Sequence, residues 1–379
     1  MIKGYKVRLL PTKEQEELMF KSIGCSRFAY NWGINRVKEY REQGKKYSMN
    51  DISKEFTQLK KVKEFEWLNE VSSKVTQESL RNLDKSFKQF FKTKKGYPKF
   101  KSKKKSKQSF YVRCDRLYFL DDYCNIEKIG KVKYKTNFKI PIGRNEYKFM
   151  NPYCVFNGKK WLICFGMDIS ENQVNFEKNE NLKIGIDLGI KDLAICSNGM
   201  VFKNINKTKR VERLKSKLKH LQRSVSRKYE QNKQGDKYIK TNNIIKLEKQ
   251  IALIYKRLAD IRDNHMYQSI NTILKKRPYK IIMEDLDVKR MMKNKHKAES
   301  IAEQRFYKFI STMKYKCEWH GIEFVQANRW FPSSKTCSNC GNIKKDLKLR
   351  DRVYICPKCG LIIDRDINAS INLMNYSEV

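Results

Sequence analysis

The sequence predicts a multidomain protein of mixed α+β and α/β class. Its 379 residues are long enough for two or three domains, each with its own core. Short β-like runs surround an all-helical block in the first half, and strands alternate with long helices in the second half. Two closely spaced C-x-x-C pairs then indicate a small metal-binding knot within the second half.

The N-terminal region is expected to begin with one strand and to continue as helices. Residues 2–10 alternate apolar and basic side chains, which is typical of a short strand. Thr12 and Gln15 have the spacing of a capping box, which predicts that a helix begins here. We expect this helix to break near Gly24 and a second helical block to span residues 50–91.

The region from residue 110 to residue 169 is predicted to be β-rich. Its apolar runs are short, and the dipeptide Asn157-Gly158 between two of them is a strong signal for a hairpin turn. Together with the strand at 2–10, these strands are expected to close a small β-barrel that holds the helical block as an insert. The polar residues 170–180 are interpreted as a linker.

The second half is predicted to combine a β-meander, a helical hairpin and further strands. Between residues 211 and 268, aliphatic side chains recur at steps of three and four on either side of a polar loop around Gly235. This pattern predicts two antiparallel helices. The other predicted elements are strands at 182–188, 192–197, 200–204, 280–286 and 322–327, and helices at 301–320 and 367–374.

Positive charge dominates the composition. The chain has 83 Lys and Arg residues against 41 Asp and Glu residues, and its formal net charge of +42 is spread along its length. Such a charge predicts binding to a polyanion through many phosphate contacts, with strong salt dependence. No run approaches about 18 apolar residues, and the first residues lack an apolar signal core. We therefore expect a cytoplasmic protein with no membrane partner.

A lysine-rich segment at residues 92–107 is a candidate nucleic-acid contact. It contains nine lysines and no acidic residue, and aromatic side chains are interleaved with the lysines. Such a segment is either a solvated loop or a surface on which lysines bind phosphates and rings stack on bases or sugars. We favour the second interpretation, with these candidate residues: Tyr97, Lys99, Lys101 and Lys103.

Four cysteines have the spacing of a zinc ribbon. Cys337 and Cys340 form one C-x-x-C pair, Cys356 and Cys359 form the other, and fifteen residues separate the pairs. Each pair supplies two thiolates, so together they complete a tetrahedral Zn²⁺ site and leave no open position for catalysis. The zinc is therefore predicted to be structural. The other seven of the eleven cysteines are scattered singly, with no disulfide-like framework.

Carboxylates at the ends of predicted elements form a candidate catalytic site. Asp187 ends an apolar strand, Glu284 ends a later strand, and Asp364 or Asp366 opens the last helix. If the first strand is central in its sheet, these ends converge, and their charges would repel unless divalent cations bind. Two Mg²⁺ or Mn²⁺ ions there would support phosphodiester cleavage. Each acid alone is also consistent with a capped turn or an ordinary charged strand end, and spacing does not choose between the two aspartates.

The segments around these residues resemble the TnpB (OrfB) family, which consists of transposon-encoded, RNA-guided nucleases similar to type V CRISPR effectors. The resemblance spans nearly the whole chain and is most specific in the C-terminal half. The matching segments are YKVRLLPTKEQ (5–15), GYPKFKSK (96–103), GIDLGIKDLA (185–194), IIMEDL (281–286), FPSSKTCSNCG (331–341), CPKCG (356–360) and DRDINASINL (364–373).

The resemblance implies a role for each candidate residue and a domain plan. Asp187, Glu284 and Asp366 match the metal-binding acids, so the family pattern favours Asp366 over Asp364, and the four cysteines match the zinc ligands. Ser370 departs from the pattern, because alanine is common there. The implied domains are a wedge-like β-barrel (1–10 and 109–170), a helical recognition insert (11–108), an RNase H-like RuvC domain (181–330 and 361–379) and an inserted zinc ribbon (331–360).

The resemblance also implies an activity and partners. It implies a Mg²⁺-dependent endonuclease of double-stranded DNA, guided by an RNA from the transposon end and dependent on a short motif beside the target. The protein is then expected to act as a monomer with its RNA and to lie on the nucleoid when bound to DNA. Three alternatives stay open: an RNA-guided regulator that binds without cutting, a transposase or transposase accessory protein, and a plain zinc-ribbon nucleic-acid binder.

Overall fold

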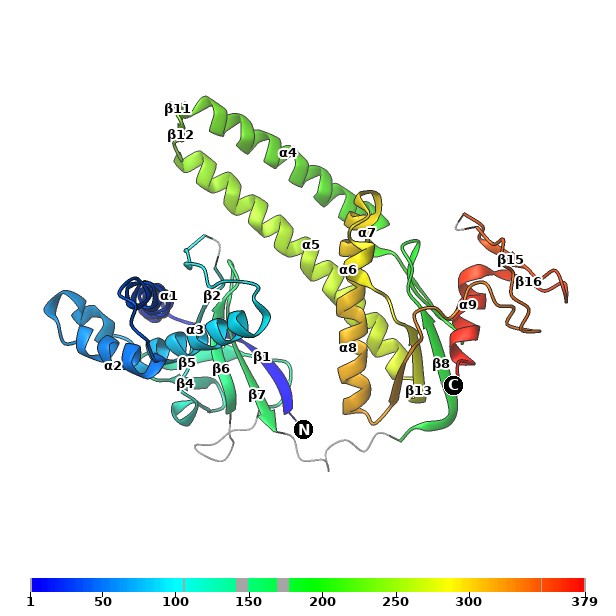
Figure 1. Ribbon diagram of the computed structural model, residues 1–379, viewed down its shortest axis with the longest axis horizontal. Helices are drawn as coiled ribbons and strands as arrows, with labels where there is room; N and C mark the ends of the chain where they lie inside the picture. The colour runs from blue at the N-terminus through cyan, green and yellow to red at the C-terminus, as the bar shows by residue number, and fades with distance from the viewer. Residues whose placement is uncertain (1, 105, 141–148, 169–176, 349, 378–379) are drawn as a thin grey trace. The chain divides into compact units, whose positions relative to one another are not determined.

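The computed structural model describes residues 2–104, 106–140, 149–168, 177–348 and 350–377 (Figure 1). The chain divides into two compact units, residues 1–171 and 172–379. Each unit has its own sheet and its own apolar core. Within these ranges, no helix combines the length and the apolar character needed to span a membrane.

A seven-stranded antiparallel sheet forms the base of the first unit, in the order β2-β6-β7-β1-β5-β4-β3. The predicted strand 2–10 is β1, and it lies at the centre between β5 and β7. Gly158, with a φ of 87°, turns the chain from β6 to β7, which confirms the predicted hairpin. The strands are β1 (Ile2–Leu10), β2 (Gln108–Tyr111), β3 (Tyr118–Phe119), β4 (Tyr123–Ile126), β5 (Gly130–Lys135), β6 (Phe149–Phe156) and β7 (Trp161–Asp168).

The predicted closure of this sheet into a barrel is not seen. β2 and β3 are the two edges, and the strands described here contain no pairing between them. These edge strands have only four and two residues, so neither offers a long ladder for closure. The predicted linker at 170–180 lies mainly outside the described residues, and its last two residues already belong to the first strand of the second unit.

Three α-helices and two 3₁₀ helices, one of them the short η2 (Cys114–Arg116), complete the described part of the first unit. The first helix begins with the predicted capping box, because the Gln15 amide donates to Thr12 Oγ1 and the Thr12 amide donates to Gln15 Oε1. The predicted break at Gly24 is wrong. The helix continues through this residue, since its long buried face outweighs the cost of one interior glycine, about 1 kcal/mol. The other elements are α1 (Lys13–Glu42), α2 (Met49–Leu59), η1 (Lys63–Asn69) and α3 (Ser73–Thr93).

The second unit contains a five-stranded mixed sheet in the order β10-β9-β8-β13-β14. Its first strand, β8, is central, as the sequence analysis required for the acids to converge. β8 pairs antiparallel with β9 and parallel with β13, and β13 pairs parallel with β14. The carboxyl ends of β8 and β13 therefore lie at one edge. The strands are β8 (Asn179–Asp187), β9 (Asp192–Cys196), β10 (Val201–Lys203), β13 (Pro278–Glu284) and β14 (Glu323–Ala327).

The predicted helical hairpin is confirmed. Helices α4 (Lys209–Gln231) and α5 (Asn242–Leu274) run side by side as a long arm, joined by the short strands β11 (Lys233–Gln234) and β12 (Lys237–Tyr238) (Figure 1). Their shared apolar seam includes Val211, Leu218, Leu221, Ile254 and Leu258.

The single helix predicted at 301–320 is two helices. α7 (Lys295–Gln304) and α8 (Phe306–Trp319) are separated by Arg305, whose φ of 58° is left-handed. The Arg305 guanidinium pairs with Asp263 on α5 at 3.0 Å. A short helix, α6 (Val288–Met291), precedes them.

The ribbon lies in sequence between β14 and the last helix. It contains the antiparallel strands β15 (Val353–Ile355) and β16 (Ile362–Asp364). β16 leads directly into α9 (Arg365–Met374), which packs against the central strand β8 (Figure 1).

Candidate functional site

The three predicted acids line one cavity of about 660 Å³ in the second unit. Asp187 is the last residue of β8, and Glu284 is the last residue of β13. Asp366 lies in the first turn of α9. Each carboxylate therefore comes from a different element, and the parallel pairing of β8 and β13 explains why two of them share an edge.

Gly185 explains how the third acid reaches this edge. A Cβ atom at this position would lie 2.1 Å from the Ser370 carbonyl oxygen and 2.3 Å from the Met374 amide nitrogen. The absent side chain therefore lets the backbone of α9 pack directly on β8. Ser370 itself is buried, and its hydroxyl donates to the Ile367 carbonyl at 2.7 Å.

The structure gives different positions to Asp364 and Asp366, between which sequence spacing could not choose. Asp364 is the N-cap of α9, and its Oδ1 accepts hydrogen bonds from the amides of Asp366 and Ile367 at 2.9 and 3.2 Å. Asp366, two residues later, lines the cavity with the other two acids. One carboxylate thus starts the helix, and the other is directed to the cavity.

The cavity places its carboxylates in an unfavourable electrostatic environment. Burial raises the pKa of Asp187 to about 7, and the neighbouring charges of Asp366 and Glu284 act in the same direction. Burial also raises the pKa of Glu284, with a further contribution from Asp285. A divalent cation would relieve this repulsion, and carboxylate oxygens are the ligands that Mg²⁺ and Mn²⁺ prefer. The donors therefore suit such ions by their chemistry. Among the described residues, only the four cysteines of the ribbon are already gathered closely enough to hold one ion.

Basic residues surround the acids. Arg352 from the ribbon lies 3.6 Å from Asp366, measured from Nη1 to Oδ2. Arg329 pairs with Asp285 at 2.6 Å and with Asp287 at 3.5 Å. The other basic residues of the lining are Lys191, Lys297, Lys335 and Arg365. A polyanion entering this cavity would therefore meet cations around a negatively charged floor.

The four predicted cysteines come together in the ribbon. Their sulfur atoms all lie within 4.8 Å of one another. Cys337 and Cys359 have their sulfurs 3.6 Å apart, and Cys340 and Cys356 have theirs 3.5 Å apart. Zn–S bonds of about 2.3 Å at tetrahedral angles would place sulfurs about 3.8 Å apart, so the set fits one zinc ion. All four ligands would be cysteine sulfurs, with no open position for a substrate, which agrees with a structural site.

Two asparagines that the sequence analysis did not use attach the ribbon to α9. The Asn368 side chain donates to the Thr336 carbonyl at 2.7 Å and accepts from the Ser338 amide at 3.0 Å. Asn372, one turn later, donates to the carbonyls of Ser333 and Thr336. Both asparagines are buried. The sequence contained a signal for this attachment, because two asparagines at i and i+4 lie on an otherwise apolar helix face. Buried side-chain amides need hydrogen-bond partners, so such a pair indicates a contact with another segment.

In the lysine-rich segment at residues 92–107, some of the predicted contact residues are half-buried and others are exposed. Tyr97 is half-buried and packs edge-on against Phe87 and Phe90, with ring centroids 5.7 and 5.2 Å apart. Lys101 is half-buried, and its ammonium lies 3.7 Å from the centroid of Tyr30. These two residues therefore contribute to the first core.

Other residues of the lysine-rich segment are exposed to solvent. Lys99 and Lys103 are exposed, and Phe100 is 51% exposed. The predicted nucleic-acid contact of this segment, which stays a prediction, is better served by these two lysines and Phe100.

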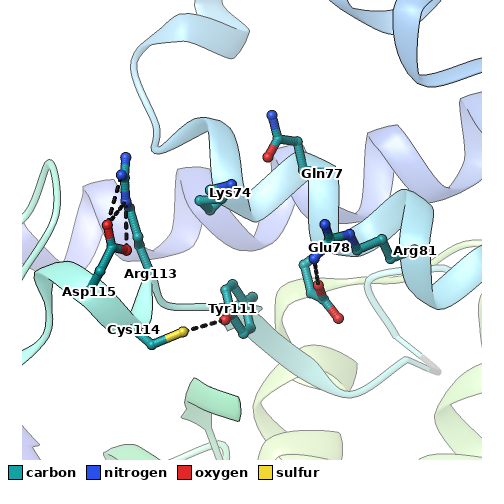
Figure 2. Close-up of a pocket in the computed structure, with 8 residues that line it drawn as sticks. All are labelled: Lys74, Gln77, Glu78, Arg81, Tyr111, Arg113, Cys114 and Asp115. Carbon is teal, nitrogen blue, oxygen red and sulfur yellow. Dashed lines mark hydrogen bonds and ion pairs between the residues drawn. The ribbon is translucent and has the colours of Figure 1, made fainter. Parts of the chain in front are cut away.

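The first unit also contains a polar pocket of about 340 Å³ that the sequence analysis missed (Figure 2). Arg113 pairs with Asp115 at 2.8 Å, and Arg81 lies 3.6 Å from Glu78. Tyr111 and Cys114 are linked through their oxygen and sulfur at 2.8 Å. The lining is completed by Lys74 and Gln77. Such a set suits polar recognition, and its two acids, Glu78 and Asp115, are each paired with an arginine.

Three family models match the chain. The model described as a helix-turn-helix domain of the OrfB IS605 type matches residues 1–46, which here form one strand and the single long helix α1. The model described as a probable transposase, OrfB IS605, matches residues 168–295. The model described as a Cas12f1-like TNB domain matches residues 306–373, including the four cysteines. Together the matches cover most of the chain. The chain belongs to the TnpB family.

Individual relatives agree with this assignment. A protein of Streptomyces pristinaespiralis is 29% identical over 98% of this chain and 88% of its own length, and it has the provisional name RNA-guided DNA endonuclease. Another, InsQ of Escherichia coli K12, is 25% identical over 98% of this chain and 92% of its own length, with the same provisional name.

A solved structure has the same fold. The chain of the Cas12f1-sgRNA-target DNA complex, determined by cryo-electron microscopy, matches with a TM-score of 0.61 over 99% of both chains, at 13% identity. At this identity the match concerns the fold, so this TnpB chain has a Cas12f-like fold with a cysteine-rich TNB region.

Proposed function

We propose that this TnpB protein is an RNA-guided endonuclease of double-stranded DNA that is encoded by a transposon. The observation that carries the proposal is the single cavity that Asp187, Glu284 and Asp366 line together with several basic residues. The names of the Streptomyces and Escherichia coli relatives support the same activity. The net charge of +42 suits a protein that holds both an RNA and a DNA duplex.

The three carboxylates are proposed to bind two Mg²⁺ or Mn²⁺ ions. When bound, such ions supply an activated water and stabilise the leaving oxygen in phosphodiester hydrolysis. Asp187, with a pKa of about 7, must lose its proton before it can serve as a ligand. Asp364 keeps α9 capped, which orients the first turn that carries Asp366. Arg352 and Lys191 at the rim attract the phosphate backbone.

The finer architecture is proposed on the same basis. The five-stranded order with β8 central supports an RNase H-like RuvC domain, into which the ribbon is inserted before α9. The first unit is proposed to act as the wedge and recognition domains and to read a short motif beside the target. The guide RNA is proposed to come from the transposon end, and the complex to contain one protein chain.

The test is cleavage of a plasmid that carries the target and its flanking motif, by protein purified with its RNA. Sequencing that RNA identifies the guide. Wild-type protein should cut in Mg²⁺, and Asp187→Ala and Asp366→Ala should bind the plasmid without cutting it. Asp260→Asn is the matched control, because this acid on α5 is exposed, pairs with Lys256 and does not line the cavity.

Other results would favour the alternatives. Unchanged cutting by Asp187→Ala would refute the assignment of the acids. Binding without products in Mg²⁺ by the wild type would indicate a regulator, and joined products would indicate a transposase. Random host RNA in place of one defined species would contradict guided cleavage.

A further inference from the structure

One wall of the acid cavity contains an exposed tryptophan. The loop at residues 328–334 leads from β14 to the ribbon, and Trp330 within it lines the cavity together with the three acids. Its side chain is 78% exposed. In the described part of the chain, no ring or cation pairs with its indole. A single exposed apolar side chain is common on protein surfaces, so exposure alone does not indicate a ligand. The place of Trp330 in the lining of a cavity with three acids and several cations is what points to one.

The loop holds Trp330 in a defined position. Its own amide donates to Asn328 Oδ1 at 2.9 Å. The preceding residue, Arg329, pairs with Asp285 just beyond β13, and the following residue, Phe331, packs edge-on against Tyr376 at 5.0 Å. Both neighbours of the tryptophan are thus attached to the body of the unit, while the indole between them is presented to the cavity.

The surroundings indicate what the indole contacts. Cations of the same lining, including Lys191, Lys297 and Lys335, suit a phosphate backbone. An aromatic ring beside a basic groove is the arrangement by which proteins bind single-stranded nucleic acid, since each base can stack on the ring whatever its identity. A protein or lipid partner would not need the acids and cations that share this cavity.

We propose that Trp330 is a stacking platform for one base of the DNA strand that lies across Asp187, Glu284 and Asp366. The stack would hold a nucleotide next to the scissile phosphate without selecting its sequence. This inference rests on the proposed function for the identity of the strand. Its test uses uncut DNA, so that failure of the stack and failure of cleavage are separate results.

The experiment places 2-aminopurine at successive positions of a single-stranded DNA oligonucleotide. Full-length protein with its co-purified RNA is used in the Asp187→Ala background, which keeps the DNA intact. Stacking on an indole quenches the fluorescence of 2-aminopurine, so one position should be quenched by the Trp330 protein. Trp330→Ala should abolish that quenching, and Trp330→Phe should retain part of it because a ring remains. Tyr307→Ala is the matched control, since Tyr307 is 74% exposed in the same unit but lies outside the cavity lining.

Affinity provides a second measurement. Loss of one base stack should weaken binding of a short oligonucleotide roughly 5- to 150-fold in Trp330→Ala. The slope of log affinity against log salt should stay unchanged, because no phosphate contact is removed. Quenching and affinity equal to those of Tyr307→Ala would overturn the proposal. A lowered melting temperature with unchanged quenching would also overturn it, because the indole would then be covered by another part of the protein.

Discussion

Replacing Gly185 by alanine tests whether the packing of α9 on β8 forms the acid cavity. The new Cβ would lie 2.1 Å from the Ser370 carbonyl oxygen, and real Cβ atoms essentially never approach closer than 3.0 Å. The helix must therefore retreat by at least 3.0 − 2.1 = 0.9 Å at this point. Because the atoms it meets are backbone, no change of rotamer relieves the contact. Overpacking of this kind lowers the free energy of unfolding by about 3 kcal/mol.

The same shift moves Asp366 relative to the other two acids. A displacement of about 1 Å at a catalytic site costs about 100-fold in rate. The melting temperature of Gly185→Ala should therefore be lower than that of the wild type by roughly 6–12 °C. The variant should cut DNA about 100-fold more slowly and still retain its RNA. Trimming the contacting residue in Gly185→Ala/Ser370→Gly should not rescue the protein, because the contact is with the carbonyl oxygen and not with the side chain.

The assays are thermal unfolding, RNA retention and single-turnover plasmid cleavage. Gly4→Ala is the matched control, because Gly4 also lies in a strand but a Cβ there would meet nothing within 4 Å. A Gly185→Ala protein with wild-type melting temperature and wild-type cutting would refute the reasoning. Rescue by Ser370→Gly would show that the close contact lies elsewhere.

Four further substitutions have defined outcomes. Asp364→Ala should lower the free energy of unfolding by about 1 kcal/mol in urea titrations, because α9 loses its cap, whereas Asp366→Ala should leave stability intact and abolish cutting. Elemental analysis should find one zinc ion per chain in the wild type and none in Cys337→Ser. The variant should also have a lower melting temperature and a lower activity. Asp187 has a folded-state pKa of about 7 and an unfolded value of about 3.9, so the stability of metal-free protein should fall as pH rises from about 4 to 7. Asp187→Asn should remove the part of this fall that Asp187 causes, while the raised pKa of Glu284 keeps a remainder. The variant should exceed the wild type in stability at pH 8 by at most about 4 kcal/mol, a difference that should vanish below about pH 4.

The features that sequence predicted well are those that follow from periodicity or ligand spacing. The hairpin of α4 and α5 follows from its apolar repeats, and the zinc ribbon follows from two C-x-x-C pairs. The convergence of Asp187 and Glu284 could be anticipated because both end strands of one sheet, and the central place of β8 was the single topological assumption required.

The features that sequence missed depend on contacts between distant segments. Nothing local distinguishes Asp364 from Asp366, and the choice becomes physical once the first carboxylate is seen to accept two helix amides. Tyr97 was expected to face a ligand, but it packs on Phe87 and Phe90 because α3 and the following loop fold together.

Local signals also misled where tertiary packing outweighed them. Gly24 suggested a break that the buried face of α1 prevents. No glycine or proline in the sequence marks the boundary between α7 and α8 at Arg305. At this residue the backbone is left-handed and the side chain forms an ion pair with Asp263, a contact that local sequence does not predict.

The position of α9 has a consequence for the synthesis of the protein. β8 is the first strand of its sheet to leave the ribosome, yet the helix that covers Gly185 begins only at Arg365. Until that helix is translated, one face of the central strand stays bare, and the third acid does not yet exist. A chain that stops before residue 365 therefore lacks Asp366 and leaves Gly185 uncovered. On the function proposed above, the cutting centre would be complete only after translation has passed the ribbon.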